Sequence, residues 1–200
     1  MKNIFTYDHW NDINFNGLED YEWKSFDNSD TRLSRLCFKA NTWEDDTPQL
    51  CFDGVEKCKE VFKKINPNCE IVALEKCLFQ RSYEGNVIEQ KNIHRDSHEE
   101  DRWSALWFLE GSGGTTLYNK WDINALAYTS EFKPGRVIVF PSQYWHGPGF
   151  PVTGWRLIVN YVFHVKNLVD DEINRPLCEC GASKEHPYCD STHNSYLKLA

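Results

Sequence analysis

The hydrophobic pattern of the chain changes its period near residue 69. Before that point, apolar residues recur at steps of three and four between Val55 and Ile65, which predicts an amphipathic helix over about 54–65. Residues 1–50 show no clear period, so only short pieces of helix or strand are expected there. Beyond residue 69, β-branched and aromatic residues form short, partly alternating runs that predict strands. The expected strands span residues 71–81, 104–109, 115–118, 136–140 and 156–164.

Gly- and Pro-containing turns separate these runs, at residues 110–114, 134–135 and 147–151. Many short strands with little helix between them predict a mainly β protein with flanking helices, folded as a sandwich or barrel of the jelly-roll kind. Three parts are expected: an N-terminal flanking region at 1–68, a β core at 69–166, and a connector with a small C-terminal module at 167–200.

Composition narrows the classes of function. A formal net charge of -8 argues against broad binding to nucleic acid or to anionic lipid, whose affinity comes from Lys and Arg. No signal-peptide core and no run of about 18 apolar residues is visible, so a cytoplasmic protein without a membrane partner is expected. The aromatic content of 14% indicates an aromatic core first and a lined pocket second.

Metal-binding side chains stand out in the β region. His94 and Asp96 are two residues apart, so in an extended segment they point to the same face. His146 follows shortly after the strand expected over 136–140. Two histidines and one carboxylate on one face of an octahedral iron leave three positions open, enough for a bidentate keto acid and dioxygen.

Arg156 lies ten residues after His146, inside an otherwise apolar run. A buried arginine is unfavourable unless an anion pairs with it, and its planar guanidinium suits a bidentate carboxylate. An ordinary salt bridge to one of the 30 acidic residues is the alternative.

The ordered set of these residues resembles the Fe(II)/2-oxoglutarate-dependent oxygenases, and its surroundings look most like their prolyl-hydroxylase branch. Residues 83–86 resemble that branch's Tyr-Pro-Gly-Asn segment, with Glu84 in place of the proline. Residues 113–117 resemble its Gly-Gly-rich strand, and residues 133–140 its Pro-Gly strand before the distal histidine. The resemblance covers about residues 70–165 and implies that the core at 69–166 is a double-stranded β-helix.

The same resemblance implies roles for individual residues. His94, Asp96 and His146 would hold iron, Arg156 would bind the distal carboxylate of 2-oxoglutarate, and Tyr83 would be a second donor to it or else a core aromatic. The implied activity uses O2 to hydroxylate a C–H bond of a peptidyl (prolyl included) or small-molecule substrate, with release of succinate and CO2. The aromatic residues expected to exclude water there, as core residues first, are Trp103, Trp107, Tyr118 and Trp145.

Two questions about this site stay open at the level of sequence. A non-catalytic iron or redox sensor is the second hypothesis, although a sensor has no need of a carboxylate-binding Arg156. The acidic segment at residues 97–101 suggests either a basic or polar substrate or a solvated loop.

The eight cysteines fall into two groups. Those of the first group are scattered through apolar or helical stretches, as reduced structural thiols usually are: Cys37, Cys51, Cys58, Cys69 and Cys77. The second group, Cys178, Cys180 and Cys189, is crowded near the C-terminus with His193, which suggests a metal. Three thiols and an imidazole can hold zinc or a 2Fe-2S cluster.

The spacing over residues 178–193 resembles the CDGSH, or mitoNEET-like, iron–sulfur family, with Ser191 where that family has glycine. The resemblance implies a 2Fe-2S cluster, with His186 outside it and zinc as the alternative. The implied ligands are Cys178, Cys180, Cys189 and His193. A homodimer through this module is a further expectation, because such modules commonly pair. Because the two centres are in one chain, the C-terminal cluster is expected either to stabilise the protein or to donate electrons to the oxygenase iron.

Overall fold

The computed structural model describes residues 3–8, 24–26, 29–85, 93–149 and 152–169 of the 200 in the chain. Within these residues lie one helix, α1 (Gln49–Ile65), and a series of strands. The strands are β1 (Phe5–Tyr7), β2 (Lys24–Phe26), β3 (Ser29–Lys39), β4 (Thr42–Trp43), β5 (Glu70–Gly85), β6 (Arg102–Gly111), β7 (Thr115–Tyr118), β8 (Leu126–Ser130), β9 (Val137–Pro141), β10 (Trp145–Pro148) and β11 (Val152–Lys166). The predicted mainly β class is confirmed.

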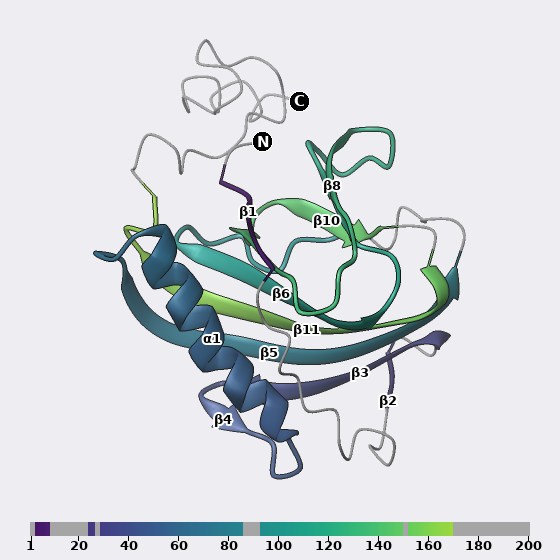
Figure 1. Cartoon of the computed structure of the whole chain (residues 1–200), viewed down its shortest axis with the longest axis horizontal. Coiled ribbons are helices and arrows are strands. Elements are labelled where there is room, and N and C mark those ends of the chain that lie inside the picture. The colour runs from purple at the N-terminus through teal and green to yellow at the C-terminus, as the bar shows by residue number, and fades with distance from the viewer. Residues whose placement is uncertain (1–2, 9–23, 27–28, 86–92, 150–151, 170–200) are drawn as a thin grey trace, which may run out of the picture.

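The strands form two antiparallel sheets (Figure 1). The large sheet has the order β1-β9-β6-β11-β5-β3-β2, with β4 beside β3, and the small sheet has the order β10-β7-β8. In Figure 1 the small sheet lies above the concave side of the large, curved one. Two facing sheets of this kind make the jelly-roll sandwich that the strand spacing predicted.

Alternation along β6 divides the interior into two clusters of apolar side chains. Trp107 packs on the side of the large sheet that α1 covers, together with Phe62 of the helix. Leu106 and Phe108 point to the opposite side and pack with Leu117 of the small sheet. Because neighbouring side chains on a strand face opposite ways, the space between the two sheets is a separate interior.

Helix α1 begins five residues earlier than its apolar pattern predicted, at Gln49 instead of about residue 54. Leu50 and Cys51 in its first turn are already buried, so the apolar face continues upstream. Gly54 marks the closest approach of the helix to the sheet, because a side chain there would overlap the hydroxyl of Tyr161.

The part of the chain before residue 69 contributes strands to the same large sheet. Strand β1 pairs with β9 at one side, and β3 pairs with β5 at the other. The 11-residue β3 is longer than the short pieces expected within residues 1–50. Charged and polar residues interrupt the apolar positions of β3, so the sequence shows no clear alternation that predicts a strand there. The boundary at residue 69 stays a prediction.

Asp8 ties the chain after β1 to the turn that precedes β9. Arg136 donates two hydrogen bonds to its carboxylate, from Nε to Oδ1 at 2.6 Å and from Nη2 to Oδ2 at 3.0 Å. Lys133 donates a third at 3.0 Å. Hydrogen bonding from Arg136 is the largest influence, and it holds the pKa of Asp8 well below its usual range in spite of partial burial.

Replacing Asp8 by Asn is expected to lower the free energy of unfolding at pH 7 by about 1 kcal/mol, or roughly 2–4 °C in Tm. The folded-state pKa lies below the unfolded value, so this stabilisation is complete above about pH 4 and is lost as the pH falls through the folded value. Urea unfolding of both proteins at pH 7 and pH 3 measures it. If the two proteins differed in free energy of unfolding by the same amount at both pH values, the low pKa assigned to Asp8 would be wrong.

Candidate metal centre

His94, Asp96 and His146 come together on the concave side of the large sheet. Their ligand atoms all lie within 4.8 Å of one another. Nε2 of His146 is 3.4 Å from one oxygen of Asp96, and Nε2 of His94 is 3.7 Å from the other. The two imidazole rings have centroids 4.4 Å apart.

The backbone explains why residues about fifty positions apart meet. The N–H of His94 donates to the carbonyl of His146 at 3.0 Å, and the N–H of His146 donates to the carbonyl of His94 at 2.9 Å. This pair of bonds forms an isolated antiparallel bridge between the segment before β6 and strand β10. The N–H of Asp96 donates to the carbonyl of Ser142 at 3.1 Å, which fixes the second half of the His-x-Asp segment.

The carboxylate of Asp96 is fully buried and is held by two neighbouring strands. Ser104 of β6 donates to Oδ2 at 2.7 Å, and its hydroxyl also lies 2.8 Å from that of Ser142. The amide of Asn160, on β11, donates to both oxygens at 3.1 and 3.2 Å. These contacts fix the plane of the carboxylate before any ligand binds.

The charges around Asp96 keep it ionised. Burial alone would raise the pKa of this carboxyl, but His146, His94 and Lys76 act against burial, in that order, and the hydrogen bond from Ser104 adds to them. The net result is a pKa of about 2 for Asp96. Nζ of Lys76 lies 3.8 Å from Oδ1. The carboxylate is therefore negative throughout the neutral range.

A backbone carbonyl orients the ring of His146. Nδ1 lies 3.0 Å from the carbonyl oxygen of Tyr144, which accepts a hydrogen bond and so requires the proton on Nδ1. Nε2 then has its lone pair free on the side of Asp96. The ring of Phe140 meets the imidazole edge-on at 4.9 Å and closes the other side.

Arg156 lies on the same face of β11 as Asn160, because the two are four residues apart on one strand. That spacing corresponds to about 13 Å along the strand. The arginine is only 5% exposed, and its Nη2 donates to the hydroxyl of Thr115 in the small sheet at 2.9 Å. Its guanidinium group is also 5.7 Å from the centre of the Phe108 ring. A buried cation therefore faces the same interior as the triad.

The donor set fits an iron(II) ion. Two imidazole nitrogens and one ionised carboxylate converge from one side, which is the arrangement of a facial triad. Oδ1 of Asn160 is buried and has no hydrogen-bond partner among the described residues, so it can accept from a metal-bound water or ligand.

Other predicted site residues lie beyond what the structure describes. Tyr83 pairs through its backbone with Trp155, but its side chain lies outside the described residues. The whole C-terminal module also lies outside the described residues, including Cys178, Cys180, Cys189 and His193. Their roles stay predictions.

The aromatic residues proposed to exclude water divide between the two faces. Trp103 and Trp107 belong to the cluster under α1, which confirms the first interpretation, that they are core residues, and removes them from the surroundings of the triad. Trp145 precedes His146 on β10, so its ring faces the other side of the strand, where the guanidinium of Arg95 lies 4.2 Å from the centre of the ring. Trp121 lies beyond it at 6.3 Å between ring centroids.

The acidic segment at 97–101 is partly neutralised by its own neighbours. Arg102 binds Glu99 at 2.5 Å and Glu75 of β5 at 2.6 Å. Glu99 and Glu100 are exposed. These contacts favour the solvated-loop interpretation over recognition of a basic substrate.

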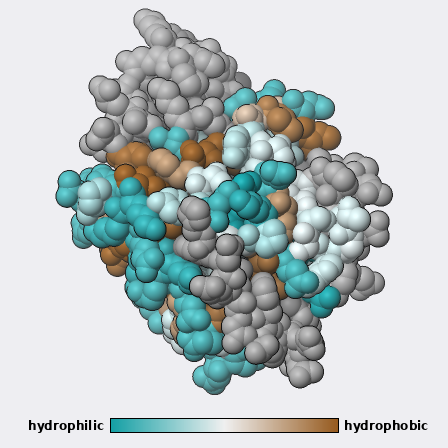
Figure 2. Space-filling model, in the orientation of Figure 1, coloured by the Kyte–Doolittle hydropathy of each residue, from teal (hydrophilic) through white to brown (hydrophobic). Residues whose placement is uncertain are grey.

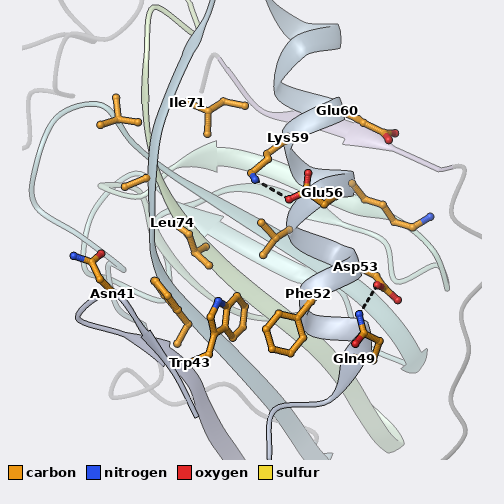
Figure 3. A pocket seen from close by; sticks show the side chains of 15 residues that line it. Asn41, Trp43, Gln49, Phe52, Asp53, Glu56, Lys59, Glu60, Ile71 and Leu74 are labelled. Carbon is orange, nitrogen blue, oxygen red and sulfur yellow. Dashed lines mark hydrogen bonds and ion pairs between the residues drawn. The ribbon is translucent and has the colours of Figure 1, made fainter. Parts of the chain in front are cut away.

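A groove of about 850 Å³ lies between α1, β4 and the start of β5 (Figure 3). The rings of Trp43 and Phe52 face each other in it at 4.2 Å between centroids. On its rim, Gln49 binds Asp53 and Lys59 binds Glu56. The groove is thus on the helix-covered side of the large sheet and contains none of the triad.

Solved structures share this architecture. AviO1 from Streptomyces viridochromogenes Tue57 aligns with a TM-score of 0.50 and 13% identity, over 73% of this chain and 73% of that one. The chain has a double-stranded β-helix fold. A 2OG-Fe(II) oxygenase family oxidoreductase from Burkholderia pseudomallei aligns at 16% identity and a TM-score of 0.49, over 68% and 69% of the two chains.

A prolyl-4-hydroxylase from Pseudomonas putida aligns at 15% identity and a TM-score of 0.47, over 66% of this chain and 70% of that one. No protein-family model and no curated protein matches the sequence. At 13% identity the likeness to AviO1 is one of fold, and the double-stranded β-helix here carries a candidate His-x-Asp…His iron site. Among the described residues, no helix is long and apolar enough to cross a membrane.

Proposed function

We propose that this protein is an Fe(II)/2-oxoglutarate-dependent dioxygenase that hydroxylates a C–H bond of its substrate and releases succinate and CO2. The observation that carries the proposal is the buried Arg156 on the same inner face as the triad. A triad alone fits many metalloproteins. A buried guanidinium farther along the same strand face adds a partner for the far carboxylate of a dicarboxylate bound at the metal.

The chain's own residues have separable tasks in this reaction. His94, Asp96 and His146 would hold Fe(II), which when bound supplies the chemistry that couples decarboxylation of the keto acid to C–H oxidation. Arg156, with Thr115 beside it, would bind the distal carboxylate of 2-oxoglutarate and fix its orientation. Tyr83 is proposed as a second donor to that carboxylate. Buried aromatic walls such as Phe108 and Phe140 keep water from the interior.

Turnover of the co-substrate tests the function directly. Purified protein with Fe(II), ascorbate and 2-oxoglutarate should form succinate slowly without substrate, and faster when a substrate is present. Iron binding with no succinate formation under any condition would overturn the proposal and favour the iron or redox sensor.

Asn160 should affect iron binding although it is not itself a proposed ligand. Replacing it by leucine, of similar size in an apolar strand, removes both amide hydrogen bonds to Asp96. We expect the affinity for Fe(II) to fall about 10–100-fold while the protein stays folded. Iron titration of the two proteins measures this. Ile158→Val, two residues away on the same face, is the matched control and should leave the affinity unchanged.

Apolar side chains gather on the surface beside the triad. Of the four large hydrophobic residues exposed in the described part of the chain, three lie within the hairpin between β7 and β8: Trp121, Ile123 and Leu126. Figure 2 shows apolar atoms at the upper right of this face, where Figure 1 places that hairpin. Trp121 is 58% exposed and lies near Trp145, which flanks His146. An exposed patch of this kind favours a peptidyl substrate over a small molecule.

Replacing Trp121 by alanine is expected to raise KM for a peptidyl substrate about 10-fold or more, since exposed tryptophans at interfaces often contribute most of the binding energy. Succinate formation without substrate should not change. A peptide library scored for a gain of one oxygen by mass spectrometry supplies the substrate. Val72→Ala, another exposed apolar residue on β5, is the control. Equal KM values for both variants would exclude the hairpin from binding.

For the C-terminal module we propose a 2Fe-2S cluster held by Cys178, Cys180, Cys189 and His193. The support is the spacing of these residues in the sequence. Purified protein should then be coloured, with visible absorbance that Cys189→Ser removes. A colourless protein with bound zinc would contradict the cluster.

A further inference from the structure

Three buried cysteines meet on the side of the large sheet opposite the iron triad. Cys37 of β3, Cys51 of α1 and Cys77 of β5 are each 0% exposed. Their sulfur atoms all lie within 4.8 Å of one another, and those of Cys37 and Cys51 are 4.0 Å apart. None of the three is part of a disulfide, as the sequence predicted. They are scattered along the sequence, and the fold brings them together.

We propose that Cys37, Cys51 and Cys77 form a second metal site, for a thiophilic divalent ion such as Zn²⁺. Three atoms separated by 4.0–4.8 Å lie roughly 2.3–2.8 Å from the centre of their triangle, and a zinc–sulfur bond is about 2.3 Å. An ion at the centre would therefore reach all three sulfurs with little movement of the backbone.

Local structure directs two of the three thiols toward the cluster. Cys37 lies at a register shift in the pairing of β3 with β5, between Leu36 and Phe38. Such bulges change the direction in which a side chain points, and they are common beside functional sites. Cys51 is in the first turn of α1, where the helix packs on the sheet.

Proton balance favours a divalent ion. Zinc binds the thiolate form of cysteine, so binding of the ion must release protons to solvent. Release of two protons leaves two thiolates and one thiol around a divalent ion, a set with no net charge. A neutral set suits this apolar interior, where an unbalanced charge is costly.

The backbone of Cys51 is held by the sheet. The hydroxyl of Tyr161, on β11, donates to the carbonyl of Cys51 at 3.1 Å. This bond fixes the first turn of α1 against the sheet. Zinc prefers four ligands in a tetrahedral arrangement, and the three thiols leave the fourth position for a further donor.

The groove of Figure 3 lies close to the cluster in the sequence and the fold. Phe38 and Phe52, the residues that follow Cys37 and Cys51, both line it. An ion held by β3, α1 and β5 would add a direct link between α1 and the paired strands β3 and β5. It would therefore stabilise the fold without taking part in the proposed oxygenase reaction.

Cobalt titration tests the site, because cobalt bound to thiolates gives a charge-transfer band in the near ultraviolet. The full-length protein with Cys178, Cys180 and Cys189 replaced by serine excludes the C-terminal thiols. In this background we expect the band to saturate at one ion per chain. The triad also binds cobalt, but through nitrogen and oxygen, so it gives no such band. Cys37→Ala should abolish the band, and Cys58→Ala, equally buried on the same helix as Cys51, should retain it.

Zinc content and stability provide the second readout, in case Cys37→Ala folds poorly. Because the triad can also hold zinc, protein purified with zinc should contain one more zinc per chain than Cys77→Ala in the same background. Removing the ions with a chelator should lower Tm by about 5–10 °C more than it does for Cys77→Ala. Cys58→Ala should keep both the extra zinc and the larger loss of Tm. The proposal would be overturned if no cobalt band appeared. It would also be overturned if Cys37→Ala and Cys77→Ala left the band and the zinc content unchanged. In either case the three thiols would only pack in the core.

Discussion

Replacing Asp96 by alanine is expected to abolish succinate formation and to weaken Fe(II) binding by more than about 100-fold. This exceeds the roughly 10–100-fold expected for an outer partner such as Asn160, because a proposed direct ligand is lost. The variant removes the charged donor of the triad and leaves two imidazoles, which hold iron(II) weakly by themselves. Iron titration and succinate formation measured on the same samples give both results.

The control for this variant is Asp53→Asn, an exposed aspartate of α1 on the other side of the large sheet. It should bind iron and form succinate as the original protein does. Circular dichroism should show that the Asp96→Ala protein is folded, since the triad lies at the edge of the packed clusters. If a folded Asp96→Ala protein still formed succinate at the original rate, the triad would not be the iron site.

Arg156 is the second position with a large expected effect. Arg156→Leu should raise KM for 2-oxoglutarate by about 100-fold or more, because two charge-assisted hydrogen bonds to a carboxylate are worth roughly 3–4 kcal/mol together. Fe(II) affinity should stay nearly the same, since the arginine is separated from Asn160 by about 13 Å of strand. Initial rates of succinate formation over a range of 2-oxoglutarate concentrations separate KM from kcat.

Lysine at the same position is the informative comparison. It keeps the charge but loses the planar fork, so Arg156→Lys should give a KM between those of the original protein and the leucine variant. Replacing a buried arginine by leucine in an apolar strand should not destabilise the fold. A leucine variant with unchanged KM would remove the carboxylate-binding role and leave Arg156 as a structural partner of Thr115.

The features that could be predicted from the sequence are those set by local spacing. The alternation of strands placed His94 and Asp96 on one side, and the structure brings them together with His146. Arg156 was noticeable because a charge interrupts an apolar run. The helix and the main strands followed from their periods, with errors at the ends, where burial of Leu50 and Cys51 extends α1 upstream.

The features that could not be predicted depend on how distant strands pair. Asn160 looked like a minor polar residue of an apolar strand until the pairing of β11 with β6 placed it opposite Leu106, near Ser104 and the carboxylate of Asp96. Lys76 approaches the same carboxylate from β5, twenty residues earlier in the chain. The cluster of Cys37, Cys51 and Cys77 likewise arises only when α1 lies across β3 and β5.

The backbone bridge between His94 and His146 has a consequence for how the protein responds to strain. One histidine is anchored through Asp96 to the turn after β9, and the other belongs to the small sheet. A shift of the small sheet relative to the large one would therefore move one proposed ligand away from the other two. The affinity for iron therefore depends on how closely the two sheets pack against each other. Mutations far from the triad that loosen this packing should weaken iron binding.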